Sequence, residues 1–459
     1  MTATPTQLAD GRSDEDRPNG DNPSTSLDIA IVGGGIIGVM MALGLLHRGM
    51  RVTLYERAND YHEIGAGFAF TGVARECMQR LNPQVLEALC RVGEENRHPN
   101  NRYWDGFNPT DKRTAESQDA LLFQMSAREL DYWGCLRSHF LRGMATYLPG
   151  GVVKFGKQME TYVDEEGSEK VVLHFTDGSV AEADAVIGCD GIHSRTRRVL
   201  LGDTHQASHA SYSHKVAYRA IVPIADGISA IGHDKANNQC THMGPDAHIV
   251  SFPVNKWTLL NLFVFMHDPE PWREPEKMTA PGTRDEVARA LRNWSPAVRE
   301  LVDLLPEHLT KWGIFDMAEH PAPTYAGGRV CIAGDAAHAS SPFHGVGACM
   351  GVEDCLVLAT ALETTMATSY DGSVLSKASA ISTAFQTYSA VRLERSHWLV
   401  ESSREMGDIY EWRYAATGHH ADKCKAEFER RSRKIWDFNV DKMVTDTESQ
   451  CILQLKTTN

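Results

Sequence analysis

A glycine-rich segment near the start of the chain, Gly33–Gly38 with the sequence GGGIIG, restricts the fold more than any other feature. The apolar run Leu27–Val32 precedes it and has the length of a buried strand. Residues of helical composition follow over Ile36–Arg48, and a second strand-like run, Arg51–Tyr55, ends next to Glu56. Strand, glycine turn, helix, strand and acidic residue in this order predict a β-α-β unit that binds a dinucleotide.

Each residue type in this unit has a chemical role that explains its position. Gly33 permits the tight turn, Gly35 lets the backbone approach a pyrophosphate, and Gly38 lets the helix pack closely on the strand. The helix N-terminus offers N–H donors and a positive dipole to the phosphates, while Glu56 is placed to bind ribose hydroxyls. A glycine-rich turn without a ligand is the alternative, which the flanking strands and helix disfavour. The motif alone does not separate FAD from NAD.

Composition and charge narrow the class of protein. The 459 residues suit two or three packed domains, and 42% apolar with 23% charged residues is ordinary for a globular chain. The formal net charge of -14 argues against a nucleic-acid partner, which needs a basic surface. No run of about 18 apolar residues is present, so we expect no membrane span. The polar segment Met1–Ser26 is expected to be a disordered tail and not a signal sequence.

The ten cysteines form no CxxC pair, and several lie in apolar runs, such as Cys189 and Cys331. This pattern is typical of small buried side chains in a reducing compartment, so we expect a cytoplasmic protein. No cluster of carboxylates and no histidine pair with ligand spacing is evident, and we therefore expect no metal site.

The rest of the chain alternates between helical and strand patterns. We predict a helix over Arg75–Val92, a long polar loop over Pro99–Ser117 and a further helix over Arg128–Thr146. Alternating apolar and polar residues over Ser208–Phe265 predict an antiparallel sheet, and the chain after about Ser379 has helical composition.

Two further segments combine with the first into a recognisable set. The second is Asp190–Gly191, within CDGIHSRTR, and the third is Gly334–Asp335, within GDAAH. In this order, the three resemble the motifs of the single-component flavoprotein aromatic hydroxylases, the para-hydroxybenzoate hydroxylase type, over about residues 27–400. The resemblance implies an FAD-dependent monooxygenase that uses NAD(P)H and O2. No second strand–GxGxxG–helix unit is present, so NAD(P)H is expected to bind transiently as a co-substrate.

The resemblance also implies how FAD is held, without a covalent bond. Asp335 matches the family aspartate that binds the ribityl chain, Arg137 matches an arginine that contacts FAD, and Asp190–Gly191 would lie near the pyrophosphate and serve the approach of NAD(P)H. A helix starting near Gly347 would direct its N-terminal dipole at the flavin, where negative charge gathers on reduction. The cofactor-binding residues that we expect are Gly33, Gly35, Gly38, Glu56, Arg57, Gly67, Arg137, Asp190, Gly191, Asp335, Gly345, Gly347 and Ala348.

Arg219 is the candidate catalytic residue for binding substrate. A flavin C4a-hydroperoxide, the oxygen donor that the resemblance implies, reacts readily only with an electron-rich ring such as a phenolate. Arg219 lies in the apolar strand pattern VAYRAI, where an arginine is costly unless it is paired. Its planar fork of donors suits a phenolate next to a carbonyl. A structural arginine in a salt bridge is the alternative. Tyr218 is expected to face away from Arg219, because neighbours in a strand alternate.

A closer resemblance concerns the segments His214–Ile221, Met243–Pro253 and Lys434–Phe438. They are similar to fungal polyketide-pathway monooxygenases that hydroxylate and dearomatise resorcinol-type benzaldehydes. The strand arginine of those enzymes matches Arg219, but a substrate-anchoring tyrosine on a nearby strand falls at Phe252, which donates no hydrogen bond. Tyr132 is the best replacement anchor, against the alternative of a packed core tyrosine. A shifted anchor would present the opposite face of the substrate to the flavin.

The remaining pocket residues and functions stay open. The pocket is expected to include Phe252, Pro342 and His344. His338 and His344 are each either a proton relay or a hydrogen-bonded structural group. A salicylate-type hydroxylase without dearomatisation and a non-catalytic FAD-binding redox module remain alternatives. A flavin halogenase is disfavoured because the tryptophans form no WxW segment, and a phenol hydroxylase because the chain is too short for its extra domain.

The predicted fold class is α/β (α+β), with a Rossmann-like FAD-binding domain, an antiparallel-sheet substrate domain and a helical C-terminus. We place the tail at 1–26, the FAD-binding domain at 27–205 and 326–395, the substrate-binding sheet at 206–325 and the helical region at 396–459. The expected partners are a phenolic small molecule and O2, with no nucleic acid. A homodimer and a monomer both stay open.

Overall fold

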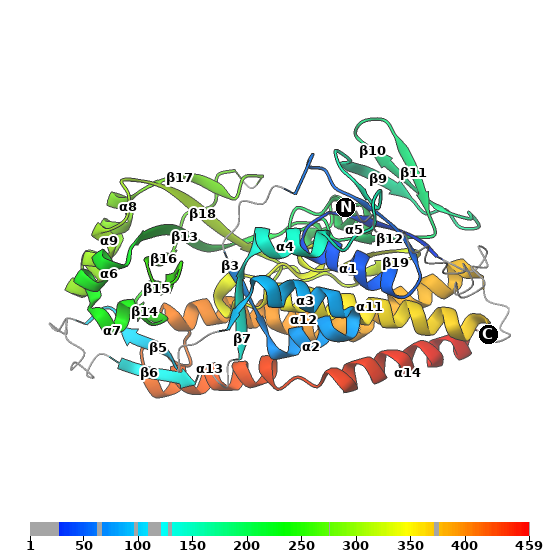
Figure 1. Cartoon of the computed structure of the whole chain (residues 1–459). Coiled ribbons are helices and arrows are strands. Elements are labelled where there is room, and N and C mark those ends of the chain that lie inside the picture. The colour runs from blue at the N-terminus through cyan, green and yellow to red at the C-terminus, as the bar shows by residue number, and fades with distance from the viewer. Residues whose placement is uncertain are drawn as a thin grey trace, which may run out of the picture.

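Two large sheets organise the chain in the computed structural model, which describes residues 27–61, 67–95, 100–108, 121–126, 131–274, 276–370 and 376–458. A six-stranded sheet carries the glycine-rich unit, an eight-stranded sheet lies beside it, and the C-terminal helices run along both (Figure 1). The predicted tail 1–26 lies outside the described residues. The predicted α/β (α+β) fold class is confirmed.

The six-stranded sheet is parallel except at one edge. Side chains of its central strand alternate, since Ile29 and Ile31 pack in the helical core whereas Ala30 and Val32 pack against the small sheet β9–β11. The predicted strand–helix–strand unit is confirmed as β1 (Asp28–Val32), α1 (Ile36–His47) and β2 (Arg51–Tyr55). The strand order is β19 (Ala326–Gly327), β20 (Val330–Ile332), β12 (Ala185–Gly188), β1 (Asp28–Val32), β2 (Arg51–Tyr55) and β8 (Val153–Lys154). The small covering sheet contains β9 (Met159–Val163), β10 (Val171–Phe175) and β11 (Val180–Ala183).

The eight-stranded sheet confirms the antiparallel pattern predicted after residue 208. Its order is β17 (Thr279–Thr283), β18 (His308–Asp316), β13 (Ser211–Pro223), β16 (Leu259–His267), β15 (Ala247–Val254), β14 (Cys240–Gly244), β5 (Asn100–Asp105) and β6 (Leu121–Ser126). One face packs against four short helices, α6 (Ile224–Ile231), α7 (His233–Ala236), α8 (Arg284–Ala290) and α9 (Pro296–Asp303). The other face turns toward the six-stranded part and the C-terminal helices.

Three local predictions need correction. The expected loop over 99–117 contains strand β5, because residues 102–105 pair with the distant strand β14, while residues 99 and 109–117 lie outside the described residues. The expected helix over 128–146 is strand β7 (Tyr132–Leu136) followed by helix α4 (Arg137–Ala145), because β7 pairs with β3 (Gly67–Thr71). Strand β4 (Glu94–Glu95) also pairs with β7. The expected helix over 75–92 is broken into α2 (Gly72–Leu81) and α3 (Pro83–Val92), where Asn82 caps α3 by accepting a hydrogen bond from the Gln84 N–H.

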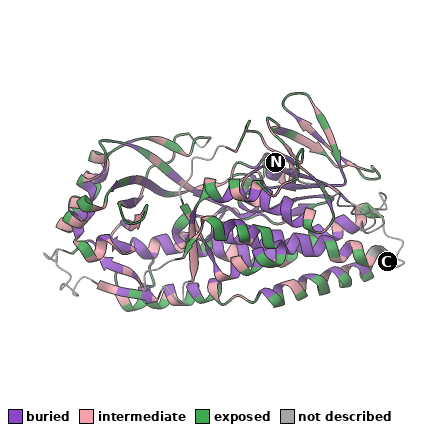
Figure 2. Ribbon diagram, viewed as in Figure 1, coloured by how far each residue is buried: buried purple, intermediate pink, exposed green. Residues whose placement is uncertain are grey.

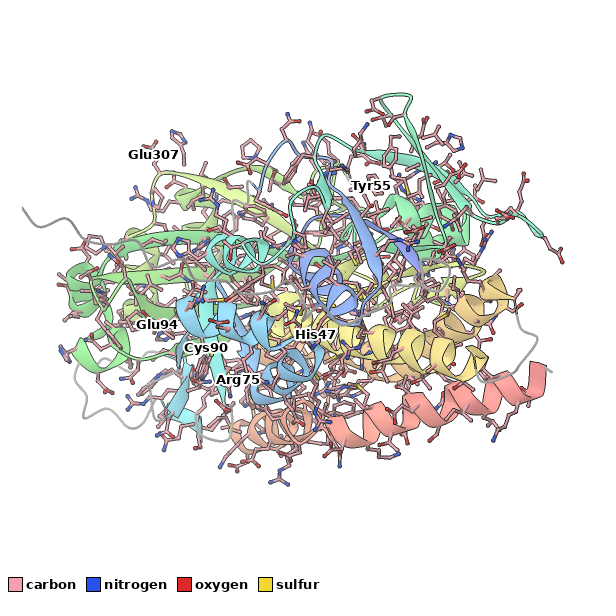
Figure 3. All side chains as sticks on the ribbon, turned by 45° about the vertical axis from the view of Figure 1, so that its right-hand side comes forward. His47, Tyr55, Arg75, Cys90, Glu94 and Glu307 are labelled. Carbon is pink, nitrogen blue, oxygen red and sulfur yellow. The ribbon has the colours of Figure 1, made fainter. Side chains whose placement is uncertain are left out.

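The long helix α11 (Gly347–Tyr370) forms the centre of the largest core. It packs against α1, α2, α12 (Lys377–Tyr410) and α14 (Val440–Thr458), and buried residues follow it and its neighbours in Figure 2. In Figure 3, side chains fill the space between the ribbons, with Tyr55 on β2 and Glu307 near the start of β18. Helix α12 continues through residue 395, and the eight-stranded sheet takes β5 and β6 from outside 206–325. The proposed domain limits stay predictions. No helix within the described part of the chain combines the length and apolar character that a membrane span needs.

Candidate functional site

The three glycine-containing segments meet at the carboxyl ends of β1, β12 and β20. Gly33 has a φ of +105°, and a Cβ on it would lie 2.4 Å from the carbonyl oxygen of Cys189 and 2.9 Å from the Cα of Asp190. Gly334 packs on the start of α1, where an added Cβ would lie 3.1 Å from Ile37. Segments far apart in sequence therefore form one edge of the sheet, which is where such folds bind a dinucleotide.

The first segment has the shape of a phosphate cradle. A Cβ on Gly38 would lie 1.9 Å from the carbonyl oxygen of Gly33, so the helix and the turn pack as closely as predicted. The position above Gly35 is open, with the nearest atom, Nη2 of Arg137, at 3.8 Å. The Glu56 carboxylate accepts hydrogen bonds from the N–H groups of Gly34 (2.6 Å) and Ala58 (2.7 Å) and so stays beside the loop. The glycine loop and Glu56 therefore fit the phosphates and the ribose of FAD.

The Asp190 carboxylate is bound within its own segment. It accepts hydrogen bonds from the Ser194 hydroxyl and, at 2.9 Å, from the N–H of Thr196 in the first turn of helix α5 (Arg195–Leu201). Burial, the largest influence, raises the pKa of Asp190. The carboxylate thus shapes the turn, which is a common role of aspartate in turns. Contact of Asp190 or Gly191 with a cofactor stays a prediction.

A network of buried charged side chains holds the third segment in place. Asp335 is exposed at the start of the short helix α10 (Asp335–His338), where the family aspartate is expected. Behind it, Asp354 accepts hydrogen bonds from the Gly334 N–H (2.9 Å) and from Nε of Arg392 (2.8 Å), and it lies 2.6 Å from Nε2 of His338. Burial alone would raise the pKa of Asp354, but His338 and Arg392 hold it at about 2. His338 is fully buried in this network, which supports its structural alternative.

Arg197 is a functional candidate that the sequence analysis overlooked. Its buried guanidinium donates from Nη1 to the carbonyl oxygens of Ala336 (3.0 Å) and Ala337 (2.6 Å), so it ties the second segment to the third. Burial lowers the pKa of Arg197 to about 10. The signal was present, since this arginine lies within the same CDGIHSRTR stretch as Asp190.

The loop after the third segment presents exposed residues beside α11. Pro342 and Gly345 are exposed, Gly345 has a φ of +70°, and α11 begins at Gly347 as predicted. His344 has its Nε2 atom 2.9 Å from the Ser402 hydroxyl. Burial, assisted by the charge of Arg431, lowers the pKa of His344 to about 3, so its ring is neutral near pH 7. Ala348 is half-buried beside this loop, while Gly67 and Arg57 are exposed on β3 and after β2.

Arg219 lies on the face of the eight-stranded sheet that turns toward the loop. Its Nε atom donates to the side-chain oxygen of Asn261 at 3.1 Å, and its guanidinium lies 5.3 Å from the ring centre of Phe263. Within the described part of the chain, no carboxylate lies within ion-pair distance of Arg219. Burial lowers the pKa of Arg219. The alternative of a salt-bridged structural arginine therefore has no support among these residues.

A row of aromatic rings connects Arg219 to the loop. Ring centres are 6.3 Å apart between Phe252 and Phe263, 5.9 Å between Phe263 and Phe265, and 5.3 Å between Phe265 and Phe343. Tyr132 packs against the same aromatic core from β7, and its hydroxyl donates to the side-chain oxygen of Gln239. Tyr218 packs on the opposite face, as alternation predicts.

A buried charged cluster on this face was also missed. The Lys215 ammonium pairs with Glu411 and, at 2.8 Å, with Asp408 on α12, and Nδ1 of His248 lies 3.3 Å from Oε1 of Glu411. Burial alone would raise the pKa of Glu411, but His248 and Lys215 hold it below its ordinary value. Lys215 could have been found by the reasoning that singled out Arg219, since both lie in the same apolar strand.

Comparisons with known proteins agree with this geometry. A family model described as "FAD binding domain" matches residues 26–401. An "FAD-dependent monooxygenase" of Aspergillus terreus is 58% identical, covering 92% of this chain and 97% of the relative, and a "Salicylate hydroxylase" of Sarocladium schorii is 44% identical, covering 94% and 92%. A solved salicylate hydroxylase in a substrate complex aligns with a TM-score of 0.79 and 27% identity, covering 92% of this chain and 98% of that one.

Proposed function

Because the chain belongs to the FAD binding domain family and is a flavoprotein monooxygenase, we propose that it hydroxylates a phenolic polyketide with NAD(P)H and O2. The proposed substrate resembles a 2,4-dihydroxybenzaldehyde, and the proposed reaction dearomatises its ring. The observation that carries the proposal is Arg219, a half-buried arginine with a neutral amide as its polar partner and no carboxylate nearby among the described residues.

Arg219 suits an anionic oxygen for electrostatic reasons. Burial disfavours its charge, and Asn261 offers only a neutral oxygen in return. A phenolate would supply the missing charge and accept two parallel hydrogen bonds from the guanidinium fork. Arg219 would thus favour the deprotonated, electron-rich ring and fix its orientation on the sheet.

The aromatic row provides the surface on which such a ring would lie. Phe252, Phe263 and Phe265 form an apolar floor beside Arg219, and this floor keeps water from the reacting carbon. FAD, when bound, takes electrons from NAD(P)H and activates O2 for transfer to the substrate. Tyr132 lies on β7, outside the eight-stranded sheet, and is proposed as the second anchor.

Dearomatisation is favoured over simple ring hydroxylation by the segments that resemble fungal polyketide enzymes. Relatives from other fungi, including one of Monascus ruber that is 44% identical, are also named FAD-dependent monooxygenases. A salicylate-type hydroxylation without dearomatisation is the second candidate, and the similarity to salicylate hydroxylases supports it. All cysteines are free thiols, and all except Cys90 are buried, which supports the cytoplasm as the proposed location.

The test is NAD(P)H oxidation by the FAD-loaded protein with and without a phenol. We expect a 2,4-dihydroxybenzaldehyde to stimulate oxidation and to yield a product one oxygen atom heavier, without aromatic absorbance. Stimulation by salicylate alone, with an aromatic product, would favour the second candidate. No stimulation by any phenol would contradict both and favour a redox module.

A further inference from the structure

The side chain of Phe343, in the loop before α11, packs into a hollow on the eight-stranded sheet, here called the socket. The ring is 7% exposed and lies between Pro342, which is exposed, and His344. Its centre is 5.3 Å from the ring of Phe265, 5.4 Å from the ring of His248 and 5.8 Å from the ammonium of Lys215. The socket therefore combines residues of β13, β15 and β16.

Helix α12 closes the socket at Gly407. A Cβ at this position would lie 2.7 Å from two carbon atoms of the Phe343 ring, a distance that real Cβ contacts do not show. Only glycine leaves room for the ring in its observed position. The loop, the sheet and the helix thus share one contact point.

Burying the charged cluster at the base of the socket has a large desolvation cost. Lys215 is 2% exposed and Glu411 is fully buried, and removing such charges from water costs more than an apolar pair of the same volume would. Nδ1 of His248 and Oε1 of Glu411 face each other at 3.3 Å, and neither atom has a hydrogen-bond partner among the described residues. Stability alone does not account for this arrangement, and buried charged groups of this kind can fix one relative geometry of the elements that carry them, here β13, β15 and α12.

This geometry connects the substrate side to the cofactor side. Lys215 and Arg219 lie on the same face of β13, separated by Ala217. Phe343 lies in the loop that leads into Gly347, the first residue of α11. The packed contact of Lys215, Phe265 and Phe343 therefore joins β13 directly to the loop.

We propose that Phe343 and its socket of Lys215, His248, Phe265 and Gly407, with Glu411 at the base, position the loop before α11 relative to Arg219, and so set how well NAD(P)H oxidation is coupled to hydroxylation. These are positioning residues, since they act through the loop and not on the reacting atoms. The coupling part rests on the proposed function, whereas the effect on the loop does not. When coupling fails, NAD(P)H and a proton reduce O2 to H2O2, and no oxygen enters the substrate.

The test compares Phe343→Leu and Gly407→Ala with a matched control, Phe428→Leu. Phe428 is also 7% exposed and belongs to the same aromatic core, but the aromatic partners of its ring are Tyr103 and Phe123. For each variant, the thermal midpoint of the apoprotein, the Kd for FAD by flavin fluorescence, and the ratio of product to NAD(P)H consumed are measured. The thermal midpoint reports the general cost of losing a buried ring.

We expect Phe343→Leu and Gly407→Ala to raise the Kd for FAD and the share of H2O2 by about tenfold, because misplaced groups at a reaction site lose rate steeply. Phe428→Leu is expected to lower the thermal midpoint similarly while leaving both readouts near those of the parent. Equal Kd values and equal product ratios in Phe343→Leu and Phe428→Leu would overturn the proposal. If no phenol stimulates the parent protein, the proposed function fails, and the Kd for FAD still decides whether the socket positions the loop.

Discussion

Gly33 lies so close to Cys189 that a single methyl group on Gly33 would approach the Cys189 carbonyl oxygen to 2.4 Å. This contact joins the first and second glycine segments at the edge of the six-stranded sheet. A chain with a larger residue at this position cannot keep both the turn and the contact, so we predict that FAD binding depends on Gly33.

Gly33→Ala is therefore expected to lose FAD. The φ of +105° adds strain of about 1–3 kcal/mol to the steric conflict. The purified variant should contain little bound FAD by its visible absorbance, and its Kd for FAD should rise. Gly151→Ala is a suitable control, since Gly151 has a φ of +85° but nothing within 4 Å of its Cβ position. Equal FAD content in both variants would contradict the assigned role of the contact.

The parts of the fold that depend on neighbours in sequence were predictable, and those that depend on distant partners were not. The unit around Gly33–Gly38 follows from local spacing and periodicity. Strand β7 was mistaken for a helix because its pairing with β3 decides its conformation. Lys215 lies in the same apolar strand pattern as Arg219, but its partner was not predictable, because Glu411 is 196 positions away. Likewise, the sequence left the role of His338 open, since only the fold brings Asp354 to its ring.

The buried Asp354 should matter for stability far more than an exposed aspartate. Asp354→Asn leaves Arg392 without its full countercharge in the core, and breaking a buried pair in this way costs about 3–5 kcal/mol. The free energy of unfolding from urea titration measures the effect. Asp441→Asn is the control, because Asp441 pairs with Arg80 while its side chain is 79% exposed, and it should change stability little. A similar effect in both variants would contradict the inferred role of the Asp354 network.

His242 predicts a specific dependence of stability on pH. Burial lowers the pKa of His242 to about 3, whereas an unfolded chain takes up this proton at about 6.5. Between these values the unfolded state binds more protons, so the stability that neutral His242 allows is present above pH 6.5 and is lost as the pH falls. The expected slope is about 1.4 kcal/mol per pH unit near pH 5.

Replacing His242 should remove this contribution. In urea titrations at pH 7, 6 and 5, the free energy of unfolding of His242→Gln should fall less steeply with decreasing pH than that of the parent protein. His47→Gln serves as the control, since His47 is exposed at the end of α1 (Figure 3). An unchanged slope for His242→Gln would show that this histidine does not titrate as its burial implies.

Arg219→Gln tests the proposed phenolate site directly. Loss of hydrogen bonds to a charged group is expected to lower kcat/KM for the phenol about 100-fold, while the FAD content stays unchanged. Arg219→Lys keeps the charge but not the planar fork, and it should recover only part of the rate. Arg292→Gln, at an exposed arginine, is the control. Wild-type kinetics in Arg219→Gln would exclude this residue as the anchor.

The pair Tyr132 and Phe252 should determine which face of the ring is oxygenated. The hydroxyl at Tyr132 comes from β7, whereas a hydroxyl at position 252 would come from β15 in the eight-stranded sheet. Moving the anchor from one wall to the other turns the substrate over, so Tyr132→Phe combined with Phe252→Tyr should invert the configuration of the product. Chiral chromatography measures the ratio of enantiomers. Tyr212→Phe is the control, because its hydroxyl binds Asp268 and its ring packs with the other face of the sheet. The same enantiomer from the double variant would exclude the anchor exchange, and a product without a stereocentre would exclude dearomatisation.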